Sequence, residues 1–328
     1  MELRMHTQIQ KESVVMSLRR NRISLATLFI AILLSVTATW SQNSQSNSAR
    51  FIIVSDEGGS ASDDQKAVAV AMAKEAERIK AQFVVTAGDN YHENGIASAT
   101  DLRWKTEFED VYSYSALQIP WYPSLGNHEY RGNVDCEIEY SKLSTRWKLP
   151  SRYYAQTERI DDSSYIVIVH LDTSPFIEEY HGDSSIYHVE GQDTKKQLVW
   201  LDSVLTITRV RWTIVVGHHP IYSATPKHGD TKELIDRVLP ILKNHRVPLY
   251  VCGHDHVLQH LKHDLMDFIV CGGGAKTRDV AQRDDVVFGV GSLGFLSVTV
   301  TAKDISVNII DSKNMVLHSV QIPAPMSK

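Results

Sequence analysis

A strand–helix–strand pattern at residues 51–86 places the strongest limit on the fold of this chain. Residues 51–55 and 83–86 are short apolar runs of the kind that form buried strands. Between them, residues 63–80 carry apolar side chains at helical spacing on one face and charged side chains on the other. A helix between two buried strands predicts a βαβ unit, whose strands lie parallel and central in a sheet. The sequence therefore predicts an α/β fold.

The alternation of strands and helices continues to residue 257 and then stops. Before that point the pattern predicts strands at 121–125, 165–171, 212–217 and 249–252 and helices at 101–111, 193–205 and 231–244. After it we expect only strands, at 258–262, 266–271, 294–301, 304–310 and 316–322, with the last three forming an antiparallel meander. No repeat or linker interrupts residues 51–328, so we expect one domain of two sheets with helices outside.

Two polar stretches are longer than simple connections need to be. They cover residues 172–192 and 275–293. Loops of this length either line a functional site or form variable excursions at the surface. The sequence leaves both interpretations open for each loop.

The first 50 residues differ in composition from the rest of the chain. Arg19, Arg20 and Arg22 precede an uncharged run at 23–40, and polar residues follow. This order is typical of a secretory signal peptide, which we predict at 1–41, followed by a polar linker at 42–50. An uncleaved membrane anchor is the alternative, since a run of 18 residues is close to the shortest that spans a bilayer.

The charge of the chain limits its partners. The formal net charge is -5, and residues 1–41 carry five basic and two acidic residues, so cleavage would leave a net charge of -8. An acidic chain disfavours nucleic acid as a partner. We therefore expect an exported monomer, periplasmic or extracellular, with no stable membrane association after the signal peptide is removed.

Five of the predicted strands end in glycine together with Asp, Asn or His. In open α/β sheets, functional sites form outside the carboxyl ends of the strands, so these turns should converge. One such turn is more often a helix cap or a tight turn than part of a site, but five in succession predict a site. The turns are Asp56-Glu57-Gly58, Gly88-Asp89-Asn90, Gly126-Asn127-His128-Glu129, Gly217-His218-His219 and Gly253-His254-Asp255-His256.

The side chains at these turns offer oxygen and nitrogen ligands and no thiolate. Imidazole together with carboxylate suits Zn, Fe or Mn and argues against a closed cysteine zinc site. About eight candidate residues are too many for one ion, and so they predict two. A bridging carboxylate would hold the two ions roughly 3.5–4 Å apart, which is the spacing used for displacement at phosphorus.

These motifs resemble those of the calcineurin-like metallophosphoesterases, and within them the small purple, tartrate-resistant acid phosphatases. The family pattern D-x-G, G-D-x-x-Y, G-N-H-[DE], G-H and G-H-x-H is present except for one letter. Longer stretches at 120–134 and 250–261 also match, and the resemblance spans about residues 51–322. It implies a four-layer α/β/β/α sandwich of two mixed sheets, the calcineurin-like metallophosphoesterase fold, as one domain at 51–328.

The resemblance implies two metal ions, Fe with Zn, Mn or a second Fe, that share one bridging carboxylate. The bridge would be Asp89. The other ligands would be Asp56 and His256 at the first ion, and Asn127, His218 and His254 at the second.

The chain departs from the family at the tyrosinate ligand of the first ion. His92 stands at that position, and Tyr91 precedes it. Our hypothesis is that His92 replaces the tyrosine, which would favour a divalent ion because a neutral imidazole replaces an anionic phenolate. The alternatives are that Tyr91 is the ligand, or that the first metal is less oxidised.

The resemblance also implies an activity, that of a secreted acid phosphatase that cleaves phosphate monoesters with a hydroxide activated by the two ions. His128 would stabilise the charge on the phosphoryl oxygens, and His228 would protonate the leaving group. His219 is expected to support a ligand rather than to be one. The substrates would be small phosphorylated molecules or a phosphoprotein.

Two other functions remain open from the sequence. A phosphodiesterase, including the cyclic-nucleotide type, could use the same core, because the loops at the rim decide which substrates fit. A non-catalytic exported protein that binds metal is a second alternative. It is disfavoured because loss of activity usually deletes ligands, whereas the ligand positions here are kept or hold a possible ligand.

Overall fold

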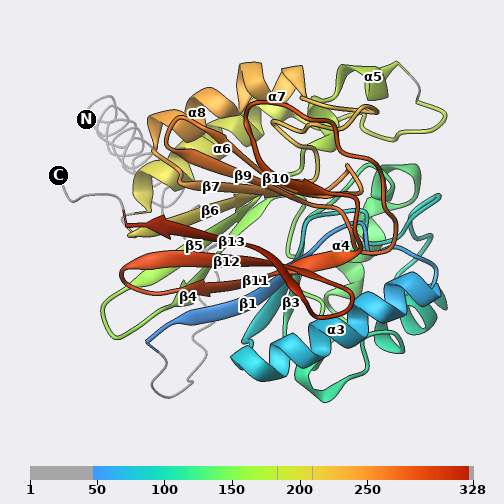
Figure 1. Ribbon diagram of the computed structural model, residues 1–328. Coiled ribbons are helices and arrows are strands. Elements are labelled where there is room, and N and C mark those ends of the chain that lie inside the picture. The colour runs from blue at the N-terminus through green and yellow to red at the C-terminus, as the bar shows by residue number, and fades with distance from the viewer. Residues whose placement is uncertain (1–46, 183, 209, 325–328) are drawn as a thin grey trace, which may run out of the picture. The chain divides into compact units, whose positions relative to one another are not determined.

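The computed structural model describes residues 47–182, 184–208 and 210–324 (Figure 1). The predicted signal peptide at 1–41 and residues 42–46 of the predicted linker lie outside the described residues. The first strand, β1 (Ala49–Val54), begins two residues before the predicted domain boundary. It does so because Ala49 and Arg50 already pair with Val300 and Thr299 of a neighbouring strand.

The first sheet has six strands in the order β13-β12-β11-β1-β2-β3. Strands β1, β2 and β3 are parallel, as the βαβ pattern predicts, whereas β11, β12 and β13 form the predicted antiparallel meander and join β1. Besides β1, the strands of this sheet are β2 (Phe83–Thr86), β3 (Trp121–Pro123), β11 (Gly294–Val300), β12 (Asp304–Asp311) and β13 (Val316–Pro323).

The second sheet has seven strands in the order β10-β8-β9-β7-β6-β5-β4. Its centre is parallel and its two edges are antiparallel. The strands β4 and β10 were not predicted, because both are edge strands whose exposed side chains break the apolar pattern. The strands are β4 (Tyr154–Arg159), β5 (Tyr165–His170), β6 (Trp212–Val216), β7 (Leu249–Cys252), β8 (Leu258–His263), β9 (Met266–Cys271) and β10 (Val286–Val290).

Two predicted helices differ from the observed ones, and two short helices, α4 and α5, were not predicted. The helix expected at 231–244 is divided at Val238, where Pro240 lies in the first turn of a new helix and has no N–H to continue the old one. The helix expected at 101–111 is a short π-helix at Trp104–Glu109. The α-helices are α3 (Asp63–Ile79), α4 (Val134–Tyr140), α5 (Glu178–His181), α6 (Thr194–Ile207), α7 (Lys232–Arg237) and α8 (Leu239–Asn244).

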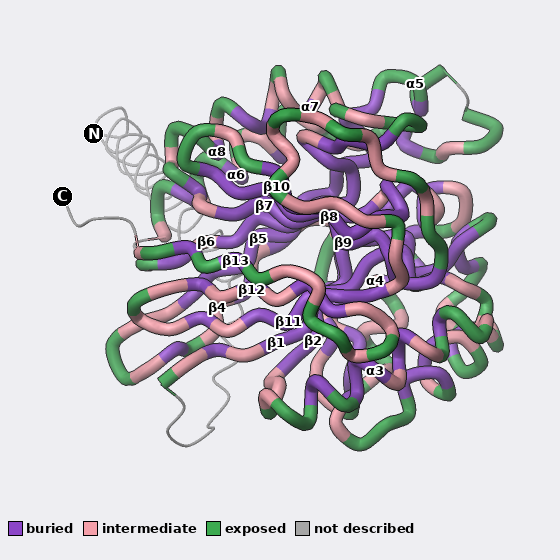
Figure 2. The backbone as a smooth tube through the Cα atoms, in the orientation of Figure 1, coloured by how far each residue is buried: buried purple, intermediate pink, exposed green. Residues whose placement is uncertain are grey.

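The two sheets stack face to face, and helices cover their outer sides. Figure 1 shows α3 outside the six-stranded sheet, and α6, α7 and α8 outside the seven-stranded sheet. The buried backbone lies between these layers, as the purple tube in Figure 2 shows. This is the four-layer arrangement of two mixed sheets that the motifs imply.

Alternating side chains supply the cores between the layers. In β1, Phe51 and Ile53 point between the sheets, whereas Ile52 and Val54 point to the layer that contains α3. In β7 the alternate residues Tyr250 and Cys252 pack under the outer helices of the second sheet. Because both faces of these strands are buried, their sequences are continuous apolar runs.

Candidate metal centre

The five predicted turns lie at the carboxyl ends of β1, β2, β3, β6 and β7, and their side chains meet. Three of these strands belong to the first sheet and two to the second. The centre therefore lies where the parallel portions of both sheets end, the position that the strand-end pattern predicts. Three overlapping groups of candidate ligands form there, and Asp89 and His92 each belong to two of them.

Unusual backbone geometry brings the turns together. Asp56, Asp89 and His254 have φ values of 57°, 55° and 67°, which place them in the left-handed region. Non-glycine residues in that region carry strain that the surrounding structure must hold in place, and such residues gather at functional sites. The turns also approach one another too closely for larger residues. A Cβ on Gly253 would lie 1.9 Å from the hydroxyl of Ser55.

The first group of candidate ligands is Asp56, His92 and His256. The Nε2 atom of His256 lies 3.3 Å from Oδ1 of Asp56. The Nδ1 atom of His92 donates a hydrogen bond to the carbonyl oxygen of Gly58, so its Nε2 atom is free to coordinate. All three side chains are at least nine-tenths buried.

The second group contains Asp89, His218 and His254, together with Asn127. Oδ1 of Asn127 lies 3.2 Å from Nε2 of His218 and 3.0 Å from Nδ1 of His254. The other nitrogen of His218, Nδ1, donates to the carbonyl oxygen of Ala87 at 3.0 Å. As in His92, this backbone bond fixes the ring and directs the remaining nitrogen into the cluster.

Asp89 lies between the two groups. Its Oδ2 atom is 3.3 Å from Nε2 of His218 and 3.7 Å from Nε2 of His92. Its other oxygen, Oδ1, accepts the backbone N–H of His128 at 3.0 Å. Asp89 is thus in the place that a bridging carboxylate would occupy.

The donor atoms fit metal ions, because two of them make no hydrogen bond within the described part of the chain. Oδ1 of Asp56 and Nε2 of His92 are buried and accept or donate no hydrogen bond. Buried polar atoms are rarely left unsatisfied in folded proteins, and a bound ion can take the place of the missing partner. A mixed set of imidazole, carboxylate and amide oxygen atoms suits Zn, Fe or Mn.

The electrostatics of the centre also favour a cation. Burial opposes ionisation of Asp89, but the imidazole of His218 outweighs it and holds the pKa of that carboxyl well below its usual value. Burial likewise opposes the charge on His218, yet Asp89 and Asp56 raise the pKa of His218 to about 10. The proton on this ring offsets the two carboxylates, and a metal ion would displace it on binding. Burial lowers the pKa of both His92 and His254, which keeps those rings neutral and available as ligands.

Tyr91 points away from the first group. Its ring packs edge-on against Trp104, with centroids 5.0 Å apart, and the guanidinium of Arg103 lies over its face. Burial raises the pKa of Tyr91 well above its usual value, which opposes formation of a phenolate. At this position the geometry therefore places His92, and not Tyr91, beside Asp56 and His256.

Of the two histidines predicted to act in catalysis, His128 forms a third group with Asp89 and His92, and His228 lies beside the second group. Nδ1 of His128 donates to the carbonyl oxygen of Glu93 at 2.7 Å, and its Nε2 lies 3.8 Å from Oδ2 of Asp89. The ring of His228 is exposed and lies 4.4 Å from the ring of His254, centroid to centroid. His228 reaches this place although it is far from the strand ends in the sequence.

One buried residue that supports the centre escaped the sequence analysis, although a motif contains it. Glu129 is buried and its carboxylate accepts the backbone N–H groups of Asp89, Tyr91 and Gly126. It therefore ties the turn after β2 to the turn after β3. The acidic residue at the end of the Gly-Asn-His-Glu motif could have drawn attention to Glu129. Its type alone does not indicate that it holds the backbone.

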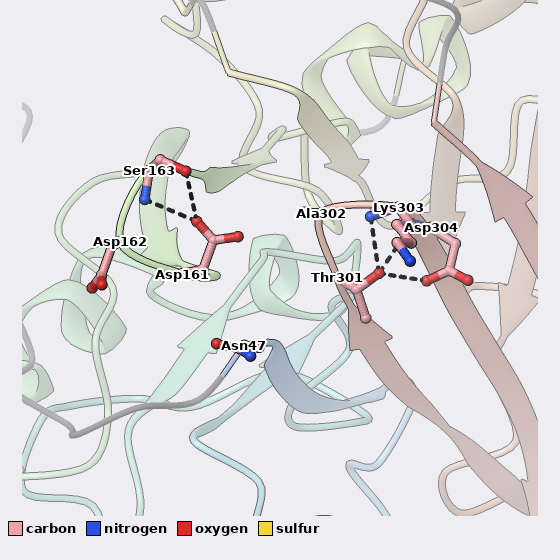
Figure 3. A pocket seen from close by; sticks show the side chains of 8 residues that line it. All are labelled: Asn47, Asp161, Asp162, Ser163, Thr301, Ala302, Lys303 and Asp304. Carbon is pink, nitrogen blue, oxygen red and sulfur yellow. Dashed lines mark hydrogen bonds between the residues drawn. The ribbon is translucent and has the colours of Figure 1, made fainter.

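A separate cavity of about 650 Å³ lies at two hairpin turns (Figure 3). In Figure 3, Asn47 lies between the turn at Asp161–Ser163 and the turn at Thr301–Asp304. Asp161 accepts hydrogen bonds from Ser163, and Asp304 accepts one from Thr301, so both carboxylates have partners within their own turns. None of the candidate ligands lines this cavity.

Comparison with known proteins agrees with the fold and shows the family. The model of the Calcineurin-like phosphoesterase family matches residues 49–258. The chain is 34% identical over 290 residues to Purple acid phosphatase 17 of Arabidopsis thaliana, covering 83% of this chain and 83% of that protein. It is 32% identical over 299 residues to Tartrate-resistant acid phosphatase type 5 of Sus scrofa, covering 84% of this chain and 86% of that protein.

A solved structure shows the same fold. It is described as GAP50, the anchor in the inner membrane complex of Plasmodium, and it superimposes with a TM-score of 0.77. The alignment covers 86% of this chain and 90% of the other, at 23% sequence identity. At that identity the similarity concerns the fold alone.

Proposed function

The chain belongs to the calcineurin-like phosphoesterase family and, as a relative of the purple acid phosphatases, is a metal-dependent phosphatase; from this premise we propose that it hydrolyses phosphate monoesters in acid at a centre of two cations. The observation that carries the proposal is the pair of ligand groups on either side of Asp89. Single-metal sites do not need a carboxylate between two sets of imidazoles.

The proposed ligands follow the two groups. Asp56, His92 and His256 would hold the first ion, Asn127, His218 and His254 the second, and Asp89 would contact both. Cations held there would attract the phosphate oxygens and lower the pKa of a water molecule, so that it can attack phosphorus in mild acid.

The side chains of this protein would supply the remaining steps. Nδ1 of His128 donates to a carbonyl, so Nε2 carries a proton only when the ring is protonated. In that imidazolium form, Nε2 would donate a hydrogen bond to a phosphoryl oxygen near Asp89. His228 makes no hydrogen bond through its ring within the described residues and is exposed beside His254. It is therefore free to give a proton to the departing alkoxide.

We propose that His92 is a ligand of the first ion. Its unpartnered Nε2 atom supports this, as does the packing of Tyr91 against Trp104. A neutral imidazole in place of a phenolate leaves less negative charge at the site, which favours a divalent ion. Without a tyrosinate ligand, an iron-loaded centre would lack the purple charge-transfer colour.

Export is also part of the proposal, and it rests on the sequence of residues 1–41. In the described part of the chain, no helix has both the length and the apolar character needed to cross a bilayer. We propose that the protein acts outside the cytoplasm, as a monomer, on small phosphorylated substrates or a phosphoprotein rather than on nucleic acid.

Metal content and hydrolysis measured together would test the function. We expect two ions per chain and faster hydrolysis of p-nitrophenyl phosphate than of bis-p-nitrophenyl phosphate in acid. Asp89→Ala should abolish hydrolysis and reduce the metal content, because both ions lose a ligand. A matched control is Asp162→Ala, which removes a fully exposed carboxylate from a distant turn.

Three outcomes would contradict the proposal in different ways. Wild-type turnover in Asp89→Ala would exclude the two-ion centre. Preference for the diester would indicate a phosphodiesterase on the same centre. Two bound ions without hydrolysis of either substrate would indicate an exported protein that binds metal without catalysis.

A further inference from the structure

The loop at 172–192 reaches the metal centre through a chain of hydrogen bonds. Within this loop, the hydroxyl of Tyr180 lies 2.9 Å from Nε2 of His219. The other ring nitrogen of His219, Nδ1, lies 2.9 Å from the hydroxyl of Thr173. Because both nitrogens of His219 are already engaged, this histidine has none left to offer a metal ion.

The hydrogen bonds of Thr173 define the direction of this chain. Its hydroxyl oxygen accepts the backbone N–H groups of His218 and His219, at 3.2 and 3.0 Å. A hydroxyl has one proton and two lone pairs, so its proton is left for Nδ1 of His219. Nε2 of His219 then carries the ring proton and donates it to Tyr180.

The ring of His219 packs against His254. Their centroids are 4.4 Å apart, and His228 lies at the same distance from His254. The carbonyl oxygen of His219 also accepts the hydroxyl of Tyr250 at 2.8 Å, which holds its backbone. His219 is thus held in place and packs against His254, the ligand of the second group that lies beside Asn127.

Tyr180 is also held by an aromatic neighbour within the loop. Its ring stacks on Tyr187 with centroids 4.1 Å apart, and the hydroxyl of Tyr187 accepts a hydrogen bond from Arg131 at 2.7 Å. Arg131 follows His128 in the turn after β3. The loop therefore spans from the segment of His128 to the segment of His218 and His219.

We propose that Tyr180 and His219 are positioning residues that hold His254 in its ligand orientation, so that the loop at 172–192 sets the affinity of the second site for a divalent cation. This inference rests on the proposed function, because it requires the two-ion centre. Groups that orient a metal ligand commonly change affinity by about 10–100-fold when they are removed. The effect should be confined to the site that contains His254.

Titration of the metal-free, full-length chain with Zn²⁺ would test the inference. Tyr180→Phe keeps the ring and its stacking but removes the hydroxyl that meets His219. We expect the wild type to bind two ions, and Tyr180→Phe to bind one of them at least about tenfold more weakly while the other is unchanged. Tyr114→Phe is the control. It removes a hydroxyl from an exposed tyrosine outside the loop at 172–192, and both affinities should be retained.

The outcomes separate this inference from the proposed function. If the wild type binds two ions and Tyr180→Phe binds both as tightly, the positioning role is wrong and the metal centre stands. If both affinities fall equally, Tyr180 acts on general stability and the inference is also wrong. A wild-type chain that takes up no Zn²⁺ would overturn the proposed function and this inference together.

Discussion

At the scale of single residues, three histidines of the centre share one arrangement. His92, His128 and His218 each donate Nδ1 to a backbone carbonyl, and each directs Nε2 toward Asp89. A carbonyl partner fixes both the tautomer and the ring orientation before a metal ion or substrate arrives. Contacts to the main chain therefore fix the orientation of these ring nitrogens. Single substitutions should have specific effects.

The visible spectrum should report which residue replaces the family tyrosine. We expect the iron-loaded wild type to have no visible band that depends on Tyr91, since that ring packs on Trp104. The substitution His92→Tyr should create a charge-transfer band, because it places a phenolate beside Asp56 and His256. A band in the wild type that disappears in Tyr91→Phe would contradict the assignment of His92.

Glu129 should contribute strongly to stability through the backbone. Glu129→Ala leaves three buried N–H groups without their acceptor, and each costs about 1–3 kcal/mol. We expect the free energy of unfolding to fall by about 3 kcal/mol or more in urea denaturation. Glu129→Gln keeps an oxygen that can accept from Asp89 and Gly126. Its free energy of unfolding should therefore lie between those of the wild type and Glu129→Ala. Glu77→Ala, at an exposed site on α3, is the control; equal stability of all variants would refute this role.

At the scale of elements, the short turns after the strands are the critical parts. Strands β1, β2 and β3 end beside β6 and β7, and the chain must leave each end without filling the space between them. Glycine allows this close approach. At Gly126 a Cβ would lie 2.4 Å from the backbone nitrogen of Asp89 and 2.2 Å from its Oδ1.

Replacing Gly126 should therefore damage the metal centre directly. In Gly126→Ala the backbone at Asp89 must move, because main-chain atoms cannot turn aside as a flexible side chain can. We expect a lower melting temperature and less bound Zn²⁺ after dialysis. Gly182→Ala is the matched control, since its Cβ would meet only the carbonyl of Glu179 at 3.4 Å. Full metal content in Gly126→Ala would show that the turn tolerates the shift.

At the scale of the whole molecule, a buried histidine joins the two sheets. His170, at the end of β5, lies 2.9 Å from the hydroxyl of Ser124, which follows β3 in the other sheet. Its ring also stacks on Tyr154 of β4, with centroids 4.3 Å apart. Burial lowers the pKa of His170 to about 3, so the folded protein holds this ring neutral.

This neutral ring should make the fold less stable in acid. An unfolded histidine titrates near 6.5, and so below that pH the unfolded chain binds one proton more than the folded chain. The free energy of unfolding then falls by up to about 1.4 kcal/mol per pH unit until the pH approaches the folded pKa. We expect His170→Phe to have a shallower loss of melting temperature between about pH 6 and pH 4.

The control for this measurement is a histidine outside the core. His188 is exposed, and His188→Gln should retain the wild-type dependence of melting temperature on pH. An unchanged slope in His170→Phe would mean that acid destabilises the fold through other groups.

Most central elements were predictable because their burial produces a local spacing of apolar residues in the sequence. The strand β2 and the helix α3 lie within one residue of their predicted limits, since both faces of the strand and one face of the helix are apolar. The edge strands β4 and β10 were not predictable, because pairing with a neighbour, rather than an apolar pattern, makes them strands. The division between α7 and α8 lies at Pro240. It was not predicted, because the apolar spacing on both sides of Pro240 fits one continuous helix.

The sequence by itself determined the family, the order of the strand-end turns and the departure at His92, because each of these is a matter of residue type at short spacing. Only the tertiary structure decided which atoms meet. It directs His92 toward Asp56 and Tyr91 into an aromatic core, and it connects Tyr180 to His219 across 39 residues. Ring orientation depends on carbonyls, hydroxyls and aromatic faces contributed by distant segments, and such contacts exist only when the two sheets have packed together.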